Sequence, residues 1–96
     1  MLRREDILAT LGSHKSALVE KYNVKTLGLF GSYSRNDASD NSDVDLLVDF
    51  SEPIGIEFVD LADELEDLLR HKVDLVSVKA VKQKYLELIQ KDIIYV

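Results

Sequence analysis

The sequence predicts an α/β (α+β) fold, a small mixed β-sheet with helices packed on it. Two observations predict it. Segments with helical periodicity alternate with short apolar runs of strand length along the 96 residues. In addition, an amphipathic segment at 54–70 separates two of these runs and is long enough to be a crossover, which favours parallel strands on either side. If the first two strands are antiparallel, the sheet is mixed.

The N-terminal half is predicted to contain a helix, two strands and a short helix between them. The helix at 4–22 is indicated by apolar residues at helical spacing, namely Ile7, Leu8, Leu11, Leu18 and Tyr22. Asn23 suits the end of this helix. Strands are predicted at 24–30 and 44–50, and a short helix is expected to begin at Gly31-Ser32. The polar, turn-rich segment 36–42 indicates a loop.

The C-terminal half is predicted to contain the clearest helix of the chain, with one continuous apolar stripe. The stripe of the helix at 54–70 consists of Ile54, Phe58, Leu61, Ala62, Leu65, Leu68 and Leu69. A third strand follows at 73–76 and a last helix at 81–89. The final residues 92–96 are apolar and are expected either to pair as an edge strand or to pack on a partner.

The composition is that of a globular domain, and we expect a single domain over residues 1–96. The formal net charge of −6 argues against a long nucleic acid as partner, because phosphate neutralisation needs a basic face. A small phosphate ligand is still compatible if metal ions bridge it to the protein. The chain has no cysteine, no signal-like N-terminus and no membrane-length apolar run, so we expect a cytoplasmic protein with no membrane partner.

Three aspartates stand where strands begin, although aspartate is a poor strand former. Asp43 and Asp45 are spaced i, i+2, which places both on one face of the second strand. Asp74 stands at the start of the third strand. With the first pair of strands antiparallel and the second pair parallel, all three would meet at one sheet edge, beside Gly31-Ser32.

Clustered carboxylates repel one another unless a cation lies among them, and Mg²⁺ prefers hard oxygen ligands. The pattern therefore predicts a magnesium site, with two ions in a phosphoryl-type displacement. Gly31 would let the backbone approach a phosphate, and Ser32 would add N–H and hydroxyl donors. Arg35, one turn later, could reach the same phosphate.

Each residue also has a structural explanation. Ser32 could only cap a helix, Arg35 could be a solvated helix residue, and Asp43 could be a turn residue. Asp45 and Asp74 each lie within an apolar run, where a carboxylate is costly. For these two aspartates the functional interpretation is favoured.

Other polar and aromatic residues are interpreted as structural. His14 and His71 are expected at the surface or at helix ends, because neither has a ligand-like partner in the sequence. Asp49 shares the parity of the acidic pair but lies at the far end of its strand, so we expect it to face solvent. The four tyrosines are interpreted as packing residues: Tyr22, Tyr33, Tyr85 and Tyr95.

The sequence resembles the minimal nucleotidyltransferase (MNT) family of the DNA polymerase β-like superfamily, in its MntA-like antitoxin type. The resemblance lies in the order of its segments: a strand, GSYSR, a polar loop, SDVDLLV and a later VDLV. The resemblance covers essentially the whole chain and implies the polymerase β-like nucleotidyltransferase fold. Asn36 is one departure, since the family usually has glycine there. Because asparagine tolerates left-handed backbone conformations, we expect the turn to be preserved.

The resemblance implies a Mg²⁺-dependent enzyme that transfers a nucleoside monophosphate, AMP from ATP, to an acceptor hydroxyl. By motif, Gly31 and Ser32 match the nucleotide-phosphate turn and Arg35 its basic position. Asp43 and Asp45 match the metal-binding pair. Asp74 matches the third carboxylate, which helps hold the catalytic metal and activates the acceptor.

In the family, such an enzyme is commonly an antitoxin that neutralises a HEPN-type toxin, in some cases by attaching AMP to a tyrosine. Two alternatives stay open: a non-catalytic module that neutralises its partner by binding, and an enzyme that modifies a small molecule. The sequence also leaves open the base preference, the acceptor and whether the protein forms a homodimer or a hetero-oligomer.

Overall fold

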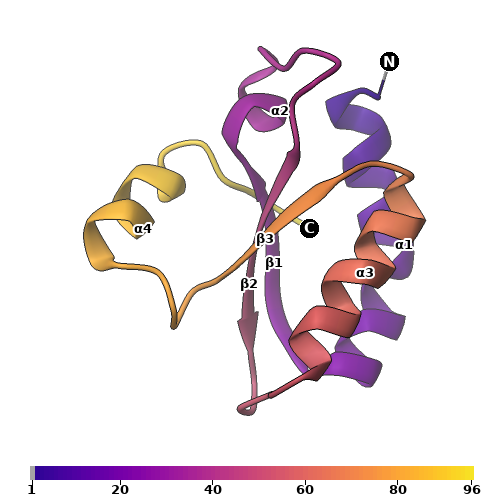
Figure 1. Ribbon diagram of the computed structural model, residues 1–96, viewed down its shortest axis with the longest axis vertical. Helices are drawn as coiled ribbons and strands as arrows, with labels where there is room; N and C mark the ends of the chain where they lie inside the picture. Colours follow the sequence, from indigo (N-terminus) through magenta and orange to yellow (C-terminus); the bar gives the residue numbers. More distant parts are fainter. Residues whose placement is uncertain (1) are drawn as a thin grey trace.

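The computed structural model describes residues 2–96, which form four helices and a four-stranded sheet (Figure 1). The elements are α1 (Arg4–Tyr22), β1 (Val24–Phe30), α2 (Gly31–Arg35), β2 (Val44–Phe50), α3 (Glu57–Leu69), β3 (Val73–Ser77), α4 (Gln83–Gln90) and β4 (Ile94–Tyr95). The strand order across the sheet is β3-β2-β1-β4. This architecture confirms the predicted fold class.

The sheet is mixed, as the sequence predicts. β1 and β2 pair antiparallel, while β2 and β3 pair parallel with α3 as their crossover. β4 pairs antiparallel with β1 at the sheet edge, through Gly28↔Tyr95 and Leu29↔Ile94. Of the two expectations for the last residues, the edge strand is therefore confirmed.

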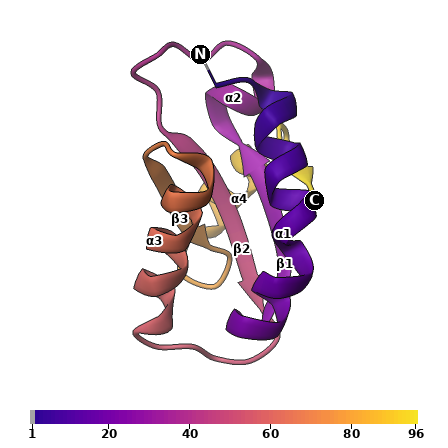
Figure 2. The same ribbon diagram turned by 90° about the vertical axis from the view of Figure 1, so that its right-hand side faces the viewer.

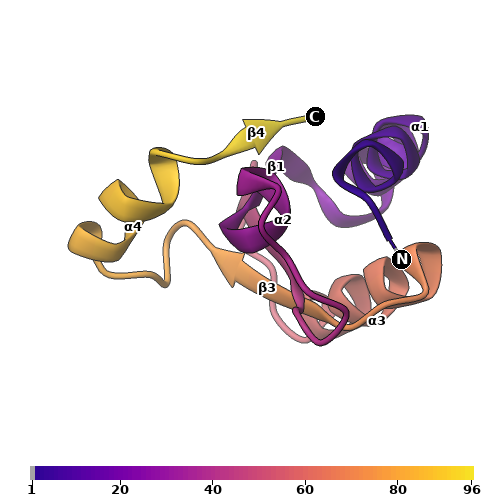
Figure 3. The ribbon, with the colours of Figure 1, turned by 90° about the horizontal axis from the view of Figure 1, so that it is seen from above.

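The hydrophobic core lies between one face of the sheet and the pair α1 and α3 (Figures 2 and 3). The alternate residues of β2 that point into this core are Val44, Leu46, Val48 and Phe50. The intervening residues Asp45, Leu47 and Asp49 face the other side of the sheet, where α4 lies (Figure 1). The strands thus separate a face packed against α1 and α3 from a more open one, on which Asp45 and Asp49 are half-buried and Leu47 is buried.

Two helices begin later than the sequence predicts. In the segment before α3, the N–H of Gly55 donates to Oε2 of Glu57 at 2.9 Å. The N–H of Phe58 donates to the Gly55 carbonyl at 3.1 Å, so a turn over 55–58 leads into the helix. In the segment before α4, the N–H of Val81 donates to the Ser77 carbonyl at 3.2 Å, which again forms a turn. In both cases local hydrogen bonds replace the first helical turn.

The tyrosines divide into two groups. Tyr22 and Tyr33 are buried, as predicted, at 6% and 3% exposed. The prediction was wrong for Tyr85 and Tyr95, which are 49% and 53% exposed, because α4 and β4 lie at the periphery of the sheet. Within residues 2–96, none of the helices has the length and apolar character needed to cross a membrane.

Candidate active site

Two of the three predicted aspartates are direct neighbours across the sheet. Asp45 of β2 is the register partner of Asp74 of β3, which places their Cα atoms about 4.8 Å apart in a parallel pair. Both side chains project from the face opposite the core. Asp43 lies two residues earlier, just outside β2, and is exposed. The predicted convergence of distant segments at one sheet edge is confirmed for Asp45 and Asp74.

The carboxyl group of Asp45 has an unusual electrostatic environment. Burial raises its pKa most, and the negative charges of Asp74 and Asp43 raise it further, to about 6. The guanidinium of Arg35 acts in the opposite direction and lowers it. Asp43 and Asp74 are therefore both close enough for their charges to act on Asp45.

Gly31 lies directly against this carboxylate. Its predecessor Phe30 is the register partner of Asp45, and Gly31 itself has a φ of 76°, in the left-handed region. A Cβ atom at this position would collide with Oδ2 of Asp45. Glycine is therefore required here both by the backbone conformation and by the approach of the metal-ligand candidate.

The helix α2 carries the rest of the predicted phosphate turn. Its N-cap is Phe30, so Ser32 is not the cap but the second helical residue, and it is half-buried. Asn36 ends α2 in the left-handed conformation, with φ 67°, and its N–H donates to the Tyr33 carbonyl at 3.2 Å. The expectation that asparagine preserves the turn in place of glycine is confirmed.

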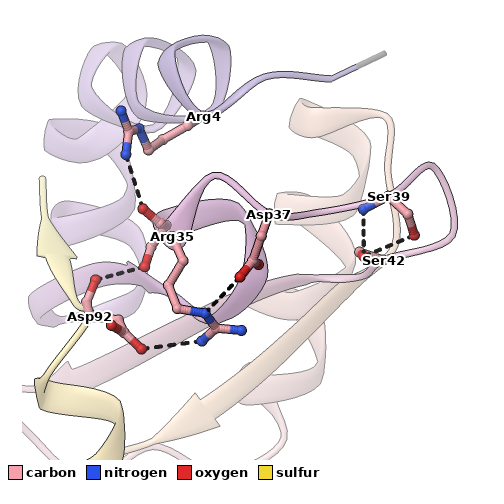
Figure 4. A network of polar contacts seen from close by, with 7 residues as sticks. Arg4, Arg35, Asp37, Ser39, Ser42 and Asp92 are labelled. Atoms are coloured by element: carbon pink, nitrogen blue, oxygen red, sulfur yellow. Dashed lines mark hydrogen bonds and ion pairs between the residues drawn. The ribbon is translucent and has the colours of Figure 1, made fainter.

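Arg35 is held by two carboxylates (Figure 4). Its Nε donates to Oδ2 of Asp37 and its Nη1 to Oδ2 of Asp92, each at 3.2 Å. These hydrogen bonds, that of Asp92 first, raise the pKa of the guanidinium. These bonds engage Nε and Nη1, whereas a guanidinium has five N–H donors, so Arg35 can keep both carboxylate partners and still bind a phosphate.

Asp92 also binds α2 through its backbone. The Ser34 hydroxyl, whose residue is 5% exposed, donates to the Asp92 carbonyl at 2.7 Å, and Nη1 of Arg4 donates to the Ser34 carbonyl at 3.1 Å (Figure 4). The C-terminal segment and α1 therefore both anchor the helix of the phosphate turn. Sequence reasoning missed Asp92, because its partner Arg35 lies 57 residues away in the chain.

A cavity of about 380 Å³ adjoins the Gly31 turn. Gly31 and Arg35 line one wall of it, and Leu88 and Ile89 of α4 line the other. The space has a charged side next to the phosphate turn and an apolar side on α4. It is large enough for a side chain or a ring of a substrate to enter beside Gly31 and Arg35, although none of the three candidate aspartates lines it.

The donor set fits a hard divalent cation. The groups at this edge are carboxylate oxygens, and a cation would offset both the burial and the repulsion by Asp74 and Asp43 that raise the pKa of Asp45. Among residues 2–96, however, no three acidic or histidine side chains are gathered tightly enough to hold a metal ion as they stand. The carboxylates would have to turn toward a shared ion, which the exposure of Asp43 and Asp74 permits.

Comparison with known sequences identifies relatives that span nearly the whole chain. Residues 14–96 match the family described as "Polymerase beta, Nucleotidyltransferase", and this range includes all the candidate site residues. The chain is 47% identical to a candidate protein adenylyltransferase of Methanocaldococcus jannaschii, over 95% of each chain. It is 41% identical to the protein adenylyltransferase MntA of Thermococcus cleftensis, over 100% of this chain and 98% of that one.

Comparison with solved structures gives the same fold. A candidate minimal nucleotidyltransferase superposes with a TM-score of 0.84 at 30% identity, covering 97% of this chain and 95% of that one. A chain of a second structure, described as a tri-AMPylated Shewanella oneidensis HEPN toxin in complex with an MNT antitoxin, gives a TM-score of 0.69 at 21% identity. That match covers 93% of this chain and 70% of the other and concerns the fold alone.

Proposed function

Because this chain belongs to the polymerase β family of nucleotidyltransferases, we propose that it transfers AMP from ATP to a hydroxyl group on a partner protein. The observation that carries the proposal is the pairing of Asp45 with Asp74 in register, with Gly31 against Asp45. Relatives at 47% and 41% identity that bear protein adenylyltransferase names support AMP as the transferred group.

We assign the residues the following roles. Asp43, Asp45 and Asp74 would hold Mg²⁺, which when bound neutralises the phosphate charge and aligns the reacting oxygens. The backbone of Gly31 and the N–H and hydroxyl of Ser32 would hold the triphosphate. Arg35 would join them through its guanidinium, of which Nε and Nη1 also bind Asp37 and Asp92.

The reaction is a displacement at the α-phosphorus. The acceptor oxygen forms a bond to that phosphorus, the bond from phosphorus to the bridging oxygen breaks, and pyrophosphate leaves with the bonding electrons. Asp74 would accept the hydroxyl proton, because it is the exposed member of the Asp45–Asp74 pair. The chain's contribution is positioning and charge stabilisation.

The proposed partner is a HEPN-type toxin, which the modification would neutralise, with a tyrosine hydroxyl as acceptor. Support comes from the MntA relative and from the structural neighbour in a complex with an AMPylated HEPN toxin. We propose that residues 1–96 act as a single transferase domain and that the partner supplies the acceptor.

The test is transfer of label from ATP labelled at the α-phosphate to a HEPN-type partner protein in the presence of Mg²⁺. We expect the double variant Asp43→Ala/Asp45→Ala to lose at least about 100-fold in rate, because the charge-stabilising groups are gone. Omission of Mg²⁺ should have a similar effect.

The matched control is Asp49→Ala. Asp49 lies on the same strand and sheet face but at the other end of β2, so this variant should transfer label at the rate of the wild type. Neutralisation of the toxin by the double variant, without label transfer, would contradict the proposal and favour the binding module.

A further inference from the structure

His71 lies where the segments of the candidate site meet. As expected, it lies at a helix end, directly after the C-cap of α3, and it is half-buried in the turn between α3 and β3. Its Nε2 is 2.7 Å from the carbonyl oxygen of Ser42 and 3.4 Å from the hydroxyl oxygen of Tyr33. Its ring also packs edge-on against Tyr33, with the centroids 5.7 Å apart and an interplanar angle of 82°.

The three residues of this contact belong to three parts of the site. Tyr33 is in α2, two residues after Gly31; Ser42 immediately precedes Asp43; and His71 stands three residues before Asp74. One imidazole therefore joins the phosphate turn, the loop before β2 and the start of β3.

The loop at Asp43 depends on this region of the chain. Asp43 lies outside β2, so the strand ladder does not fix it directly. Instead it is held on both sides: His71 binds the carbonyl of Ser42, and the carbonyl of Lys72 accepts the N–H of Val44 at 2.9 Å. Two adjacent residues, 71 and 72, thus anchor the backbone on either side of the Asp43 carboxylate.

The chemistry of the partners fixes the proton on the imidazole. A carbonyl oxygen can only accept a hydrogen bond, so Nε2 must carry a proton and donate it to Ser42. The same nitrogen also lies near the Tyr33 hydroxyl oxygen, at the longer distance of 3.4 Å. A side chain that donates from this position can therefore replace histidine, and one that cannot donate will leave the Ser42 carbonyl without its partner.

We propose that His71 is a positioning residue of the transferase, which holds the Asp43 loop so that the Asp43 carboxylate can share a divalent cation with Asp45 and Asp74. The proposal rests on the function proposed above. Some groups orient a metal ligand by hydrogen bonding and touch neither the metal nor the substrate. Their removal typically lowers metal affinity or activity 10–100-fold.

The experiment compares His71→Ala, His71→Gln and the control His14→Ala. The Gln amide can still donate to Ser42, whereas Ala cannot. His14 is exposed on α1, and its ring is within hydrogen-bonding distance of Thr10 and Ser13 of the same helix, away from the candidate site. Four quantities are measured on each protein: Mn²⁺ affinity with a non-hydrolysable ATP analogue, kcat for AMP transfer, KM for ATP, and the unfolding temperature.

We expect His71→Ala to weaken Mn²⁺ binding about tenfold and to lower kcat by 10–100-fold, with KM for ATP changed less than about threefold. His71→Gln should recover most of both losses. His14→Ala should behave as the wild type. If His71→Ala does not fold, His71→Phe keeps the volume of the ring without the donor and should show the same loss.

Two results would overturn the proposal. One is a folded non-donating variant, His71→Ala or His71→Phe, with the Mn²⁺ affinity and kcat of the wild type. The other is a Gln variant that folds as the wild type but shows the same losses as those variants. The metal titration separates the role of His71 from the proposed transferase function. If the wild type binds Mn²⁺ but transfers no AMP, the proposed reaction is refuted, and the Mn²⁺ affinities of the His71 variants still test the role of His71.

Discussion

At the scale of single residues, Asp45 combines a useful position with a cost to stability. Its pKa is raised from 3.8 to about 6, by burial first and then by Asp74 and Asp43. In the unfolded chain the same carboxyl ionises near its ordinary value. Folding therefore favours the protonated form of Asp45, and the metal-free protein should be penalised when the group is ionised.

This predicts that Asp45→Asn stabilises the metal-free protein at pH 7. A group with a raised folded pKa contributes stability that is fully present below the unfolded pKa and is lost as pH rises through the folded pKa. The increase in the free energy of unfolding of Asp45→Asn over the wild type should therefore be absent below pH 4, grow between pH 4 and 6, and level off above pH 6. Since the group is only half-buried, we expect about 1 kcal/mol at pH 7.

Urea denaturation of both proteins in the presence of a chelator, at half-unit steps from pH 4 to pH 8, would measure this difference. A gain of the same size at every pH would show that packing, and not the charge of Asp45, is responsible. Added Mg²⁺ should reverse the order at pH 7, because the cation stabilises only the carboxylate form.

Gly31 gives a second prediction at this scale. Gly31→Ala places a methyl group in a left-handed conformation and against the Asp45 carboxylate, so we expect a loss of about 1–2 kcal/mol or more in the free energy of unfolding and a loss of AMP transfer. Thermal unfolding and the transfer assay would measure both effects.

The chain offers a matched control in Gly12, which lies in α1 with no atom within 4 Å of an added Cβ. Gly12→Ala should stabilise the protein by roughly 0.5–1 kcal/mol, because alanine is the better helix former. If both glycine variants behaved alike, the special role of position 31 would be refuted.

At the scale of elements, the local sequence pattern was sufficient to predict the bounds of a helix or strand where a single spacing of apolar residues runs through the whole segment. The bounds of α1, β1 and β2 agree with the predicted ranges, because their apolar spacing and their terminal Asn23 and Gly31 are local signals. The starts of α3 and α4 were missed by two or three residues, because short-range hydrogen bonds such as that between Gly55 and Glu57 compete with the first turn.

The candidate site was predictable to the extent that it depends on strand parity and topology. Asp45, Asp74 and Gly31 meet because of the sheet register, which follows from the order of elements. The contacts of His71 and Asp92 could not be foreseen, because they join loop and turn residues whose relative position no strand register sets. Such contacts depend on how loops close in three dimensions, and no local pattern encodes them.

The helix α4 differs from the other long helices in having no buried residue. Leu88 is 56% exposed, whereas Leu65 of α3 is fully buried in the core. We therefore expect Leu65→Ala to cost about 2–5 kcal/mol and Leu88→Ala less than about 0.5 kcal/mol. Chemical denaturation of the isolated protein would test this, and a large loss for Leu88→Ala would show that α4 is packed in solution.

At the scale of the whole molecule, one face of the sheet packs the core and the other carries the candidate site. One face is closed by α1 and α3 and contains the apolar core. The other bears the paired aspartates and is bordered by α2 and α4 (Figure 3). Adjacent residues of β2 thus serve different purposes, because successive side chains of a strand point in opposite directions.

This alternation has a consequence for how such a protein can diverge. Substitutions on the open face can alter what the enzyme recognises while the interior that holds the fold together is left as it is. Adaptation to a new acceptor and retention of a foldable chain then become largely separate problems for selection, even though both are encoded within the same seven residues of one strand.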